Sequence, residues 1–565
     1  MTDVPDLSAR RFASLLLAVV CLAVTLRTVY PTADPPWHTP VGVTWHDEGP
    51  WVHNARNRAL FGQWSLDQWN PMYLAPVFAG LEYASFATLG VGTWQARLVS
   101  EVMGTISVVC IALGVAAIGT RRAGLAAALL LATNYIYVMW DRAALMEAAM
   151  TAFMVLAWAA YACAPRRSAL GFLAAVAALL AFFTKAAAAF FVGALGLDAL
   201  LTLWLARAAA NGSAEARARR AALWTLAGFA ASGAIALAVF VIPYWSEFRF
   251  YNWQMSVTRK PSYSVKAILD RVSWIPIIHD FFTRQWLVTA LALTACLGLL
   301  ARWRAVAPAE RLLALWIGLG FAELIAHDVG NERRFIFLIP AVTALAALVL
   351  YRDRRLLTEG AATVSRRGLL YALPAVALVV YIIVGAVVRL PFLYRVAPGV
   401  HWSAAVAIPL IAGLVLFWPS VRPALIARSW TPAGAGVIVA VLIAGDLVQF
   451  AQWAALRTYK NVTASRLVGQ WLPPGTLVHG KLANGLGLEN AIRPVFVGRG
   501  FGNYDDRARR PDIRYILTYT SPRLGYEGPV ILDVLAAHPG WRILREFDVA
   551  ETESGADRAA LIEKP

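Results

Sequence analysis

The sequence has few charged residues and almost no cysteine. Charged residues make up 15% of the 565 residues, whereas hydrophobic residues make up 59%. Soluble domains carry roughly 25% charged residues, so the composition excludes a soluble enzyme and indicates a polytopic membrane protein. The 4 cysteines all lie in apolar segments. This excludes a disulfide framework for any part of the chain that lies in water.

Acidic residues are scarcer than basic ones. The chain has 34 Asp and Glu against 51 Lys and Arg, a formal net charge of +17. An excess of this size could indicate nucleic-acid binding, but most of the arginines form short clusters between apolar runs. That pattern is typical of membrane topology and not of a DNA-binding face, so we expect no nucleic-acid partner.

Apolar segments of spanning length recur through most of the chain. A helix that crosses a bilayer needs about 20 predominantly apolar residues. The first such segment is longer than the apolar part of a signal peptide and lacks a clear cleavage site, so we expect it to remain as a span. We expect about thirteen transmembrane helices, near residues 12–30, 97–118, 123–139, 143–163, 168–184, 186–206, 221–244, 285–301, 309–326, 335–350, 368–389, 403–418 and 432–450.

The arginine clusters predict how these helices are oriented. Clusters such as Arg121–Arg122 and Arg366–Arg367 fall in alternate loops, and positively charged loops stay in the cytoplasm. The N-terminus is therefore expected in the cytoplasm, and residues 31–96 are expected to form the first extracytoplasmic loop. The composition, rich in Ala and Arg, favours the plasma membrane of a bacterium, that is, its inner membrane.

Residues 455–565 no longer show the membrane pattern. Short apolar runs alternate with turn signals such as the LPPG stretch at 472–475, which predicts a small extracytoplasmic α/β domain of roughly 100 residues. We expect this domain to follow a transmembrane catalytic domain over residues 1–454. No motif in the C-terminal domain predicts chemistry.

The first loop opens on the stretch HDEGP. His46, Asp47 and Glu48 precede Pro50, which suits a first helical turn, so we expect a short amphipathic helix that lies on the membrane surface, followed by a second surface helix over 71–92. Two adjacent carboxylates at a membrane boundary need open water, or a cation, a proton or a substrate to hold. They either cap the helix or belong to a site.

Further polar clusters lie at the ends of later spans, all on the same predicted side as the first loop. Snorkelling or headgroup contact explains each cluster alone, but their convergence on one membrane face predicts a functional site. The members are Asp141, Arg142 and Glu147 in DRAALME, Lys185 in AFFTKAAAAFF, and Arg333 and Arg334 in NERRFIFLIP.

These clusters resemble, in their order, the polytopic GT-C glycosyltransferases, in particular protein O-mannosyltransferases and the lipid A aminoarabinose transferase of glycosyltransferase families 39 and 83. The resemblance covers about the first 350 residues, and the later spans and the tail match in architecture. The family's lysine is often followed by glycine, where this chain has Ala186. The motifs are HDEG after the first span, Asn70, Pro71 and Tyr73, the ARL run at 96–98, Arg142 with Glu147, Thr184 with Lys185, and Arg333, Arg334 and Phe335 with Pro340.

The resemblance implies transfer of a sugar from a polyprenyl-phosphate carrier to an acceptor hydroxyl on the extracytoplasmic face, the acceptor being a glycan, a lipid or a protein. A carboxylate must then take the acceptor proton and cations must stabilise the leaving phosphate. We expect Asp47 to be the base, with Glu48 beside it. The expected phosphate ligands are Arg142, Lys185, Arg333 and Arg334, and the expected sugar- or cation-orienting residues are Glu147, Asp141 and His53. His46, Asp47 and Glu48 could together hold a divalent metal ion. The two histidines of this region, His46 and His53, are seven residues apart, and this spacing does not require a metal ion.

Three other interpretations remain open. A transporter or flippase of a lipid-linked substrate would use Glu147 and Lys185 for an ion pathway, but no internal repeat is apparent. A non-catalytic assembly protein could keep the fold. Within the same fold, the acceptor could be a cell-wall glycan. The acceptor pocket is expected among 245–284, 390–402 and the tail, and the first of these segments is rich in aromatic residues.

Overall fold

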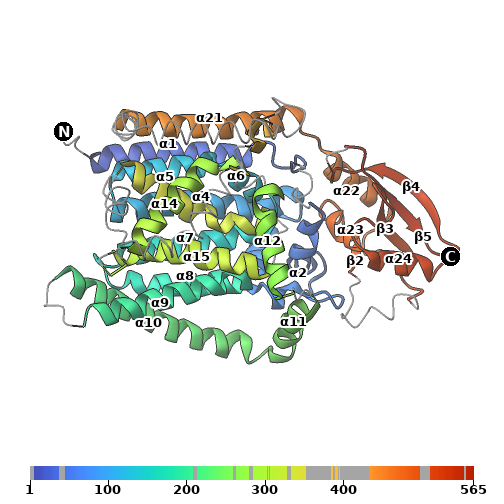
Figure 1. Ribbon diagram of the computed structural model, residues 1–565. Helices are drawn as coiled ribbons and strands as arrows, with labels where there is room; N and C mark the ends of the chain where they lie inside the picture. Colours follow the sequence, from blue (N-terminus) through green and yellow to red (C-terminus); the bar gives the residue numbers. More distant parts are fainter. Residues whose placement is uncertain are drawn as a thin grey trace.

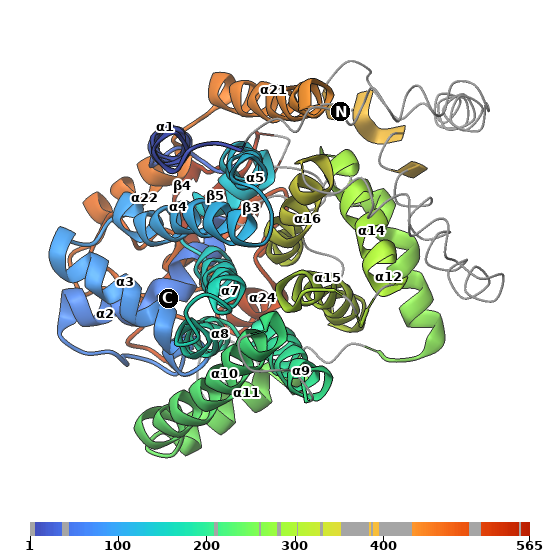
Figure 2. The same cartoon turned by 90° about the vertical axis from the view of Figure 1, so that its left-hand side faces the viewer.

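The computed structural model consists of a bundle of helices with a small sheet domain at one end (Figure 1). It describes residues 6–36, 45–207, 213–258, 262–278, 284–301, 303–304, 306–327, 332–351, 384–385, 388–391, 393–394, 432–496, 510–552 and 555–565. The helices of the bundle lie side by side, and several are seen nearly end-on in Figure 2. The expected division into a helical membrane part and a small C-terminal α/β domain is thus the observed fold class.

The bounds of the helices follow the predicted spans closely. The helices are α1 (Ala9–Thr28), α2 (Glu48–Phe61), α3 (Pro76–Leu89), α4 (Thr93–Ile118), α5 (Arg121–Thr133), α6 (Tyr135–Asp141), α7 (Met146–Cys163), α8 (Leu170–Thr184), α9 (Ala189–Leu205), α10 (Ala214–Ala236), α11 (Trp245–Thr258), α12 (Val265–Ile278), α14 (Trp286–Ala301), α15 (Pro308–His327), α16 (Ile339–Tyr351) and α21 (Pro432–Leu456). Short helical turns are η1 (Trp45–Asp47), η2 (Pro71–Tyr73), η3 (Ala186–Ala188), η4 (Leu237–Val241) and η5 (Glu332–Leu338).

Seven helices among the described residues are long and apolar enough to cross a membrane, or up to eight if α5 and α6 form one span bent by 61°. The chain is therefore a multi-pass membrane protein. The predicted span 168–184 is the shorter apolar helix α8, and the predicted spans 285–301 and 309–326 are the helices α14 and α15. The predicted spans 368–389 and 403–418 lie largely outside the described residues.

Small side chains let the central helices approach closely. Helix α7 lies between α4 and α8, and its Ala152 and the Ala178 of α8 are fully buried. At Gly124 of α5, a Cβ atom would lie 2.5 Å from the carbonyl oxygen of Ala112 in α4. Such contacts are typical of membrane helices, where close packing replaces the hydrophobic effect between helices.

The C-terminal domain is built on a five-stranded mixed sheet with strand order β2-β1-β3-β5-β4. Strand β1 is parallel to β2 and β3, whereas β5 is antiparallel to β3 and β4. Side chains of β3 alternate between the faces: Leu517 packs with α22, and Ile516 packs with α24. The elements are α22 (Lys460–Trp471), β1 (Leu477–His479), α23 (Lys481–Gly485), β2 (Arg493–Val495), β3 (Tyr515–Ser521), α24 (Pro529–Ala536), β4 (Arg542–Asp548) and β5 (Arg558–Glu563).

The C-terminal domain is fixed to the membrane part by the first loop. Trp45 of η1 lies in the hydrophobic core of the domain, beside Val478 and Tyr519. Asp34 accepts hydrogen bonds from the backbone N–H groups of Lys460 (2.7 Å) and Asn461 (3.1 Å). A carboxylate at the N-terminus of a helix, here α22, stabilises it by capping and by the helix dipole.

Helix α2 has the predicted bounds, but its polar residues are not exposed. Gly62, with φ 76°, ends it as expected. The predicted polar face in water is wrong, because His53, Asn54 and Asn57 are buried, and His53 and Asn54 bond to residues 64–70 of the same loop. Arg56 donates to the carbonyl oxygens of Gly487 (2.8 Å), Asn490 (2.9 Å) and Ile492 (2.9 Å). The predicted surface helix 71–92 is the turn η2 followed by α3, which packs against α2 and α4.

Gly49 marks the closest approach between the first loop and the C-terminal domain, and its replacement by alanine should separate them. A Cβ atom there would lie 1.9 Å from the carbonyl oxygen of Asn484, so the backbone must move. We expect Gly49→Ala to destabilise the protein by about 1–3 kcal/mol. Gly80→Ala is the matched control, because Gly80 has open space around it. Thermal unfolding in detergent should show a lower melting temperature for Gly49→Ala only, and equal melting temperatures would contradict the close contact.

Candidate active site

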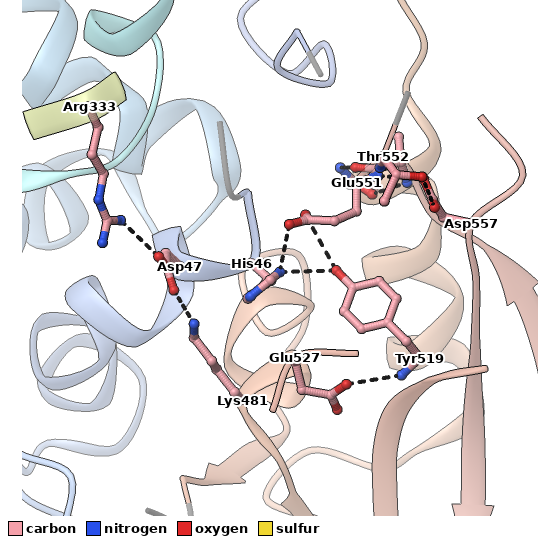
Figure 3. Close-up of polar contacts among 11 residues, drawn as sticks. His46, Asp47, Arg333, Lys481, Tyr519, Glu527, Glu551, Thr552 and Asp557 are labelled. Atoms are coloured by element: carbon pink, nitrogen blue, oxygen red, sulfur yellow. Dashed lines mark hydrogen bonds and ion pairs between the residues drawn. The ribbon is translucent and has the colours of Figure 1, made fainter. Parts of the chain in front are cut away.

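The side chain of Asp47 lies between two cations from distant parts of the chain (Figure 3). Its Oδ2 accepts a hydrogen bond of 2.8 Å from Nη1 of Arg333, which belongs to η5. Its Oδ1 forms an ion pair with Lys481 at the start of α23 in the C-terminal domain. Burial alone would raise the pKa of the Asp47 carboxyl, but Lys481 and Arg333 outweigh burial and hold that pKa well below its ordinary value. Asp47 is therefore ionised and oriented from both sides.

Arg333 extends this contact into a chain of alternating charges. Its Nε lies 3.4 Å from Oε1 of Glu147, and the same oxygen lies 2.6 Å from Nζ of Lys185. The order is Lys481, Asp47, Arg333, Glu147 and Lys185, from α23, η1, η5, α7 and the turn between α8 and η3. Three cations and two carboxylates leave an excess of one positive charge. We call this set the charge chain.

Two further features bear on what the charge chain can bind: an additional positive charge and a carboxylate oxygen without a donor. Arg334 lies close enough to Lys185 to repel its ammonium group, which adds positive potential at that end of the chain. Glu147 is buried, and among the described residues its Oε2 has no hydrogen-bond partner. A buried carboxylate oxygen without a donor is destabilising, so this atom is available to a hydroxyl group of a ligand.

Glu48 turns away from the charge chain. Its two carboxylate oxygens lie 2.9 Å from Nε and 2.8 Å from Nη2 of Arg97, in a bidentate pair, and one of them also accepts from the backbone N–H of Ala144 at 2.8 Å. Glu48 therefore connects the first loop to α4 and to the turn that precedes α7. We expected a catalytic Glu48 beside Asp47, but the structure places Glu48 in a structural ion pair with Arg97.

Arg142 and Asp141 also have structural surroundings, contrary to the prediction. Arg142 donates to the carbonyl oxygens of Leu26 (3.0 Å) and Tyr30 (2.8 Å), and its guanidinium lies 4.6 Å from the centre of the Trp453 ring. It thus satisfies carbonyls that the end of α1 leaves without partners. Asp141 and Arg27 form an ion pair of 2.8 Å in which both side chains are 0% exposed. Neither residue reaches the charge chain.

The expected metal ligands diverge. His46 Nδ1 lies 3.1 Å from the hydroxyl oxygen of Tyr519 and 3.2 Å from the carboxylate of Glu551, while Asp47 pairs with Arg333 and Lys481 (Figure 3). Glu48 pairs with Arg97. Nowhere in the described ranges does a group of three His, Cys, Asp or Glu side chains gather so that it could hold a metal ion. The residues present therefore do not fit a metal at this position.

His53 is likewise part of the loop's own structure. Its Nε2 lies 3.2 Å from Asp67 and 3.1 Å from Nδ2 of Asn57. The other carboxylate oxygen of Asp67 accepts from the backbone N–H of Phe496 at 3.1 Å. His53 thus supports the loop where it meets the C-terminal domain, and it does not face the charge chain.

An aromatic cluster lies beside α2, in part where the acceptor pocket is expected. Tyr251 of α11 stacks on Tyr73, with ring centres 5.7 Å apart, and Trp69 stacks on Phe496 at 4.6 Å. Trp69 donates through Nε1 to the carbonyl oxygen of Pro50 at 2.8 Å, which places the cluster beside α2. Most of the second expected segment, 390–402, lies outside the described residues.

The sequence pattern missed three residues of the C-terminal domain that contact the predicted site. They are Lys481, Tyr519 and Glu551. Lys481 follows the carboxyl end of β1, a strand with parallel neighbours on both sides. The carboxyl ends of parallel strands are where α/β domains commonly place ligand-binding residues. That position is the one signal in the sequence that could have indicated Lys481.

The new assignment of Arg142 is testable. Arg142→Met should lower the melting temperature, because the carbonyl groups at the end of α1 lose their donors, and we expect a destabilisation of about 1–3 kcal/mol. If the protein binds polyprenyl phosphate through the charge chain, the affinity of the folded variant should stay within about twofold of the wild type, because Arg142 lies outside that chain. Equilibrium binding of undecaprenyl phosphate to the protein in detergent measures this. A tenfold loss of affinity with unchanged stability would return Arg142 to the phosphate site.

Comparisons with known proteins agree with this architecture. The family model of dolichyl-phosphate-mannose-protein mannosyltransferases matches residues 71–255, which is less than half of the chain. A search of curated protein sequences finds no match. Two solved structures of ArnT from Cupriavidus metallidurans, each 16% identical, superpose over 98% of this chain and 98% of theirs. The apo form has a TM-score of 0.54, and the form bound to undecaprenyl phosphate has a TM-score of 0.52.

The chain has the GT-C fold. The predicted resemblance to GT-C membrane glycosyltransferases is therefore confirmed at the level of fold, with the family match restricted to the segment from the first loop to α11. In this GT-C chain the charge chain lies where the helical bundle meets the C-terminal domain. Its five residues come from both parts.

Proposed function

We propose that this protein is a glycosyltransferase that moves a sugar from a polyprenyl-phosphate donor to an acceptor hydroxyl, with Asp47 as the general base. The observation that carries the proposal is the charge chain: an ionised carboxylate held beside arginine and lysine at the end of a GT-C bundle. The ArnT structure with undecaprenyl phosphate bound supports a donor of this class.

The reaction follows from the charges. The acceptor hydroxyl oxygen attacks the anomeric carbon, the bond from that carbon to the phosphate oxygen breaks, and the hydroxyl proton passes to a carboxylate oxygen of Asp47. The phosphate gains one negative charge as it leaves. Lys185, Arg333 and Arg334 are cations held near one another, and they stabilise that charge without reorganisation. A single displacement of this kind inverts the configuration at the anomeric carbon.

Glu147 binds the sugar with one carboxylate oxygen and the cations with the other. Its Oε1 holds Lys185 and Arg333, and its unpartnered Oε2 accepts a hydrogen bond from a sugar hydroxyl. Because the pairs with Glu147 fix both cations, the donor phosphate meets a preorganised site. The aromatic cluster of Trp69, Tyr73, Tyr251 and Phe496 offers faces on which an acceptor or sugar ring can stack.

The proposed location is the extracytoplasmic face of a bacterial plasma membrane. The charge chain lies at the end of the bundle that carries the C-terminal domain (Figure 1), and the basic loops predict that the opposite end faces the cytoplasm. The donor is then a carrier lipid charged on the cytoplasmic side. The acceptor is a glycan, a lipid or a protein in the envelope.

Transfer by the purified full-length protein tests the proposal. The protein in lipid nanodiscs is incubated with a panel of radiolabelled polyprenyl-phosphate sugars and an extract of bacterial envelopes, next to the Asp47→Asn variant. Labelled product that forms with one donor, and only with the wild type, supports the proposal and identifies the sugar. If no donor gives product although undecaprenyl phosphate binds, the glycosyltransferase proposal is wrong and lipid transport becomes the better explanation.

A further inference from the structure

Both carboxylate oxygens of Asp47 are occupied, and this creates a difficulty for a general base. Arg333 holds Oδ2 and Lys481 holds Oδ1. An acceptor hydroxyl must reach one of these oxygens to give up its proton. A carboxylate that is paired with two cations is also a weak base, because Lys481 and Arg333 hold the pKa of Asp47 well below its ordinary value. Asp47 becomes a stronger base when one of the two cations yields its place to the acceptor hydroxyl.

We infer that Lys481 is the cation that yields, so that the C-terminal domain supplies a positioning residue to the active site. In the resting protein Lys481 holds Asp47 in place, and on binding the acceptor hydroxyl takes the position of the Lys481 ammonium at Oδ1. This inference rests on the proposed function. It adds to that function a residue from a domain in which the sequence predicts no chemistry.

The surroundings of the two cations decide which one moves. Arg333 is also paired with Glu147, and its side chain is 10% exposed. Lys481 is 28% exposed, and within the described part of the chain Asp47 is its one recorded ion-pair partner. A lysine ammonium on a flexible stem breaks one contact when it moves, whereas Arg333 would have to leave two carboxylates. Lys481 is therefore the exchangeable partner.

The backbone of Lys481 is fixed, so only its side chain is free to move. The preceding Gly480 has φ 116°, a conformation that side chains rarely adopt, and a Cβ atom there would lie 2.6 Å from the carbonyl oxygen of Leu517. At the other end of α23, a Cβ atom at Gly485 would lie 3.0 Å from Cα of His46. These contacts hold the start of α23 against β3 and its end against η1, and they keep the backbone of Lys481 within reach of Asp47.

The charges around Asp47 give the direction of the pH effect. Lys481 from α23, Arg333 from η5 and His46 from η1 face the Asp47 carboxylate, and all three lower its pKa. Glu147 of α7 acts on it through Arg333. His46 is itself held by Glu551 and by Tyr519, and Glu527 of the C-terminal domain also lies near His46.

Removal of Lys481 leaves fewer cations at an already buried carboxylate, so the pKa of Asp47 rises. A base works only when it is ionised, so the acid side of the pH profile moves to higher pH.

The test compares three variants of the full-length protein in nanodiscs. Lys481→Met keeps the length of the side chain and removes its charge, and Lys481→Arg keeps the charge. Arg545→Met is the matched control, because Arg545 is an exposed cation on β4, the strand at the far edge of the sheet from β2. We measure kcat and the donor KM between pH 3 and pH 9, because the low pKa of Asp47 places the acid side of the wild-type profile below pH 5.

We expect Lys481→Met to lower kcat/KM roughly ten- to hundredfold at pH 7, with the donor KM within about threefold of the wild type. The acid side of its profile should lie about one pH unit higher. Lys481→Arg should recover most of the activity and the wild-type profile, and Arg545→Met should match the wild type. If the wild type transfers sugar and Lys481→Met has the wild-type rate and profile, this inference is wrong while the proposed function stands.

A second measurement tests the contact without catalysis. Melting temperatures of Asp47→Asn, Lys481→Met and the double variant form a double-mutant cycle. A non-additive effect shows that the two side chains interact across the domain boundary. Additive effects would overturn the inference even if the wild type had no transferase activity with any donor, so the two proposals can fail separately.

Discussion

Replacement of Asp47 by asparagine should lower the kcat of sugar transfer by about 10²–10⁴-fold, the range over which general bases contribute. Asparagine has nearly the same shape and can still accept a hydrogen bond from Arg333, but it cannot take up the acceptor proton. The donor KM should remain equal or fall, because the variant keeps the cations of the charge chain and loses one negative charge that repels the donor phosphate.

The measurement is initial-rate kinetics with the donor that the panel identifies, together with equilibrium binding of undecaprenyl phosphate. Asp512→Asn is the control, since Asp512 is an exposed carboxylate paired with Arg510 in the C-terminal domain. Asp47→Asn with the kcat of the wild type would show that another group is the base. A large rise in the donor KM at constant kcat would instead assign Asp47 to donor binding.

The low pKa of Asp47 also predicts the pH dependence of the wild type. Lys481 and Arg333 overcome the effect of burial, so the carboxylate stays ionised well below the range in which an ordinary aspartate titrates. The activity should therefore not fall through protonation of this base as the pH drops from 7 to 5. A fall over that range in the wild type that persists after the rates are corrected for unfolded protein would contradict the arrangement in which both cations hold the resting carboxylate.

The sequence could predict those parts of the site that depend on topology. Asp47, Glu147, Lys185 and Arg333 each stand at the end of an apolar segment on the same predicted side of the membrane, and the structure places them in one chain of contacts. Helix α2 was equally predictable, because Pro50 and Gly62 act locally at its two ends.

Polar residues that complete the helical framework could not be separated from the site by their position in the sequence. Arg142 and Asp141 stand next to each other at the same membrane face as Glu147. Arg142 donates to carbonyl groups at the end of α1 that have no partner within the helix. Asp141 pairs with Arg27 inside the bundle. Glu48 is similar, since its partner Arg97 lies in the next long helix, α4. Both sets of partners depend on how the helices pack.

Contacts between the first loop and the C-terminal domain could not be predicted from the sequence, for a different reason. Lys481 and Asp47 are more than 400 positions apart, and no periodic pattern links a short strand of the tail to the first loop. The docking depends on shape, on Trp45 in the core of the domain and on Gly49 against Asn484. The burial of Arg56 in α2 follows from the same docking, because Arg56 donates to carbonyl oxygens of the C-terminal domain.

Replacement of Arg333 by methionine should affect two steps of the proposed reaction. Arg333 lies between Asp47 and Glu147, so its loss leaves two carboxylates with one cation fewer beside the donor phosphate. We expect the affinity for undecaprenyl phosphate to fall at least tenfold and kcat to fall by about 10²–10³-fold, the typical loss when one preorganised donor to a developing charge is removed. Arg333→Lys should be intermediate, because a lysine supplies the charge but not the planar fork that reaches two carboxylates.

Binding and rate, measured separately, show how Arg333 acts. Arg142→Met is the comparison, because it also removes a buried arginine near this end of the bundle but leaves the charge chain complete. If Arg333→Met lowers kcat and leaves phosphate affinity unchanged, then Arg333 acts through Asp47 and the phosphate is held by Lys185 and Arg334. In that case the acid side of the pH profile must move upward, because the pKa of Asp47 rises when Arg333 is lost. If both quantities match those of Arg142→Met, the charge chain has no part in the reaction, and the proposal loses the observation that carries it.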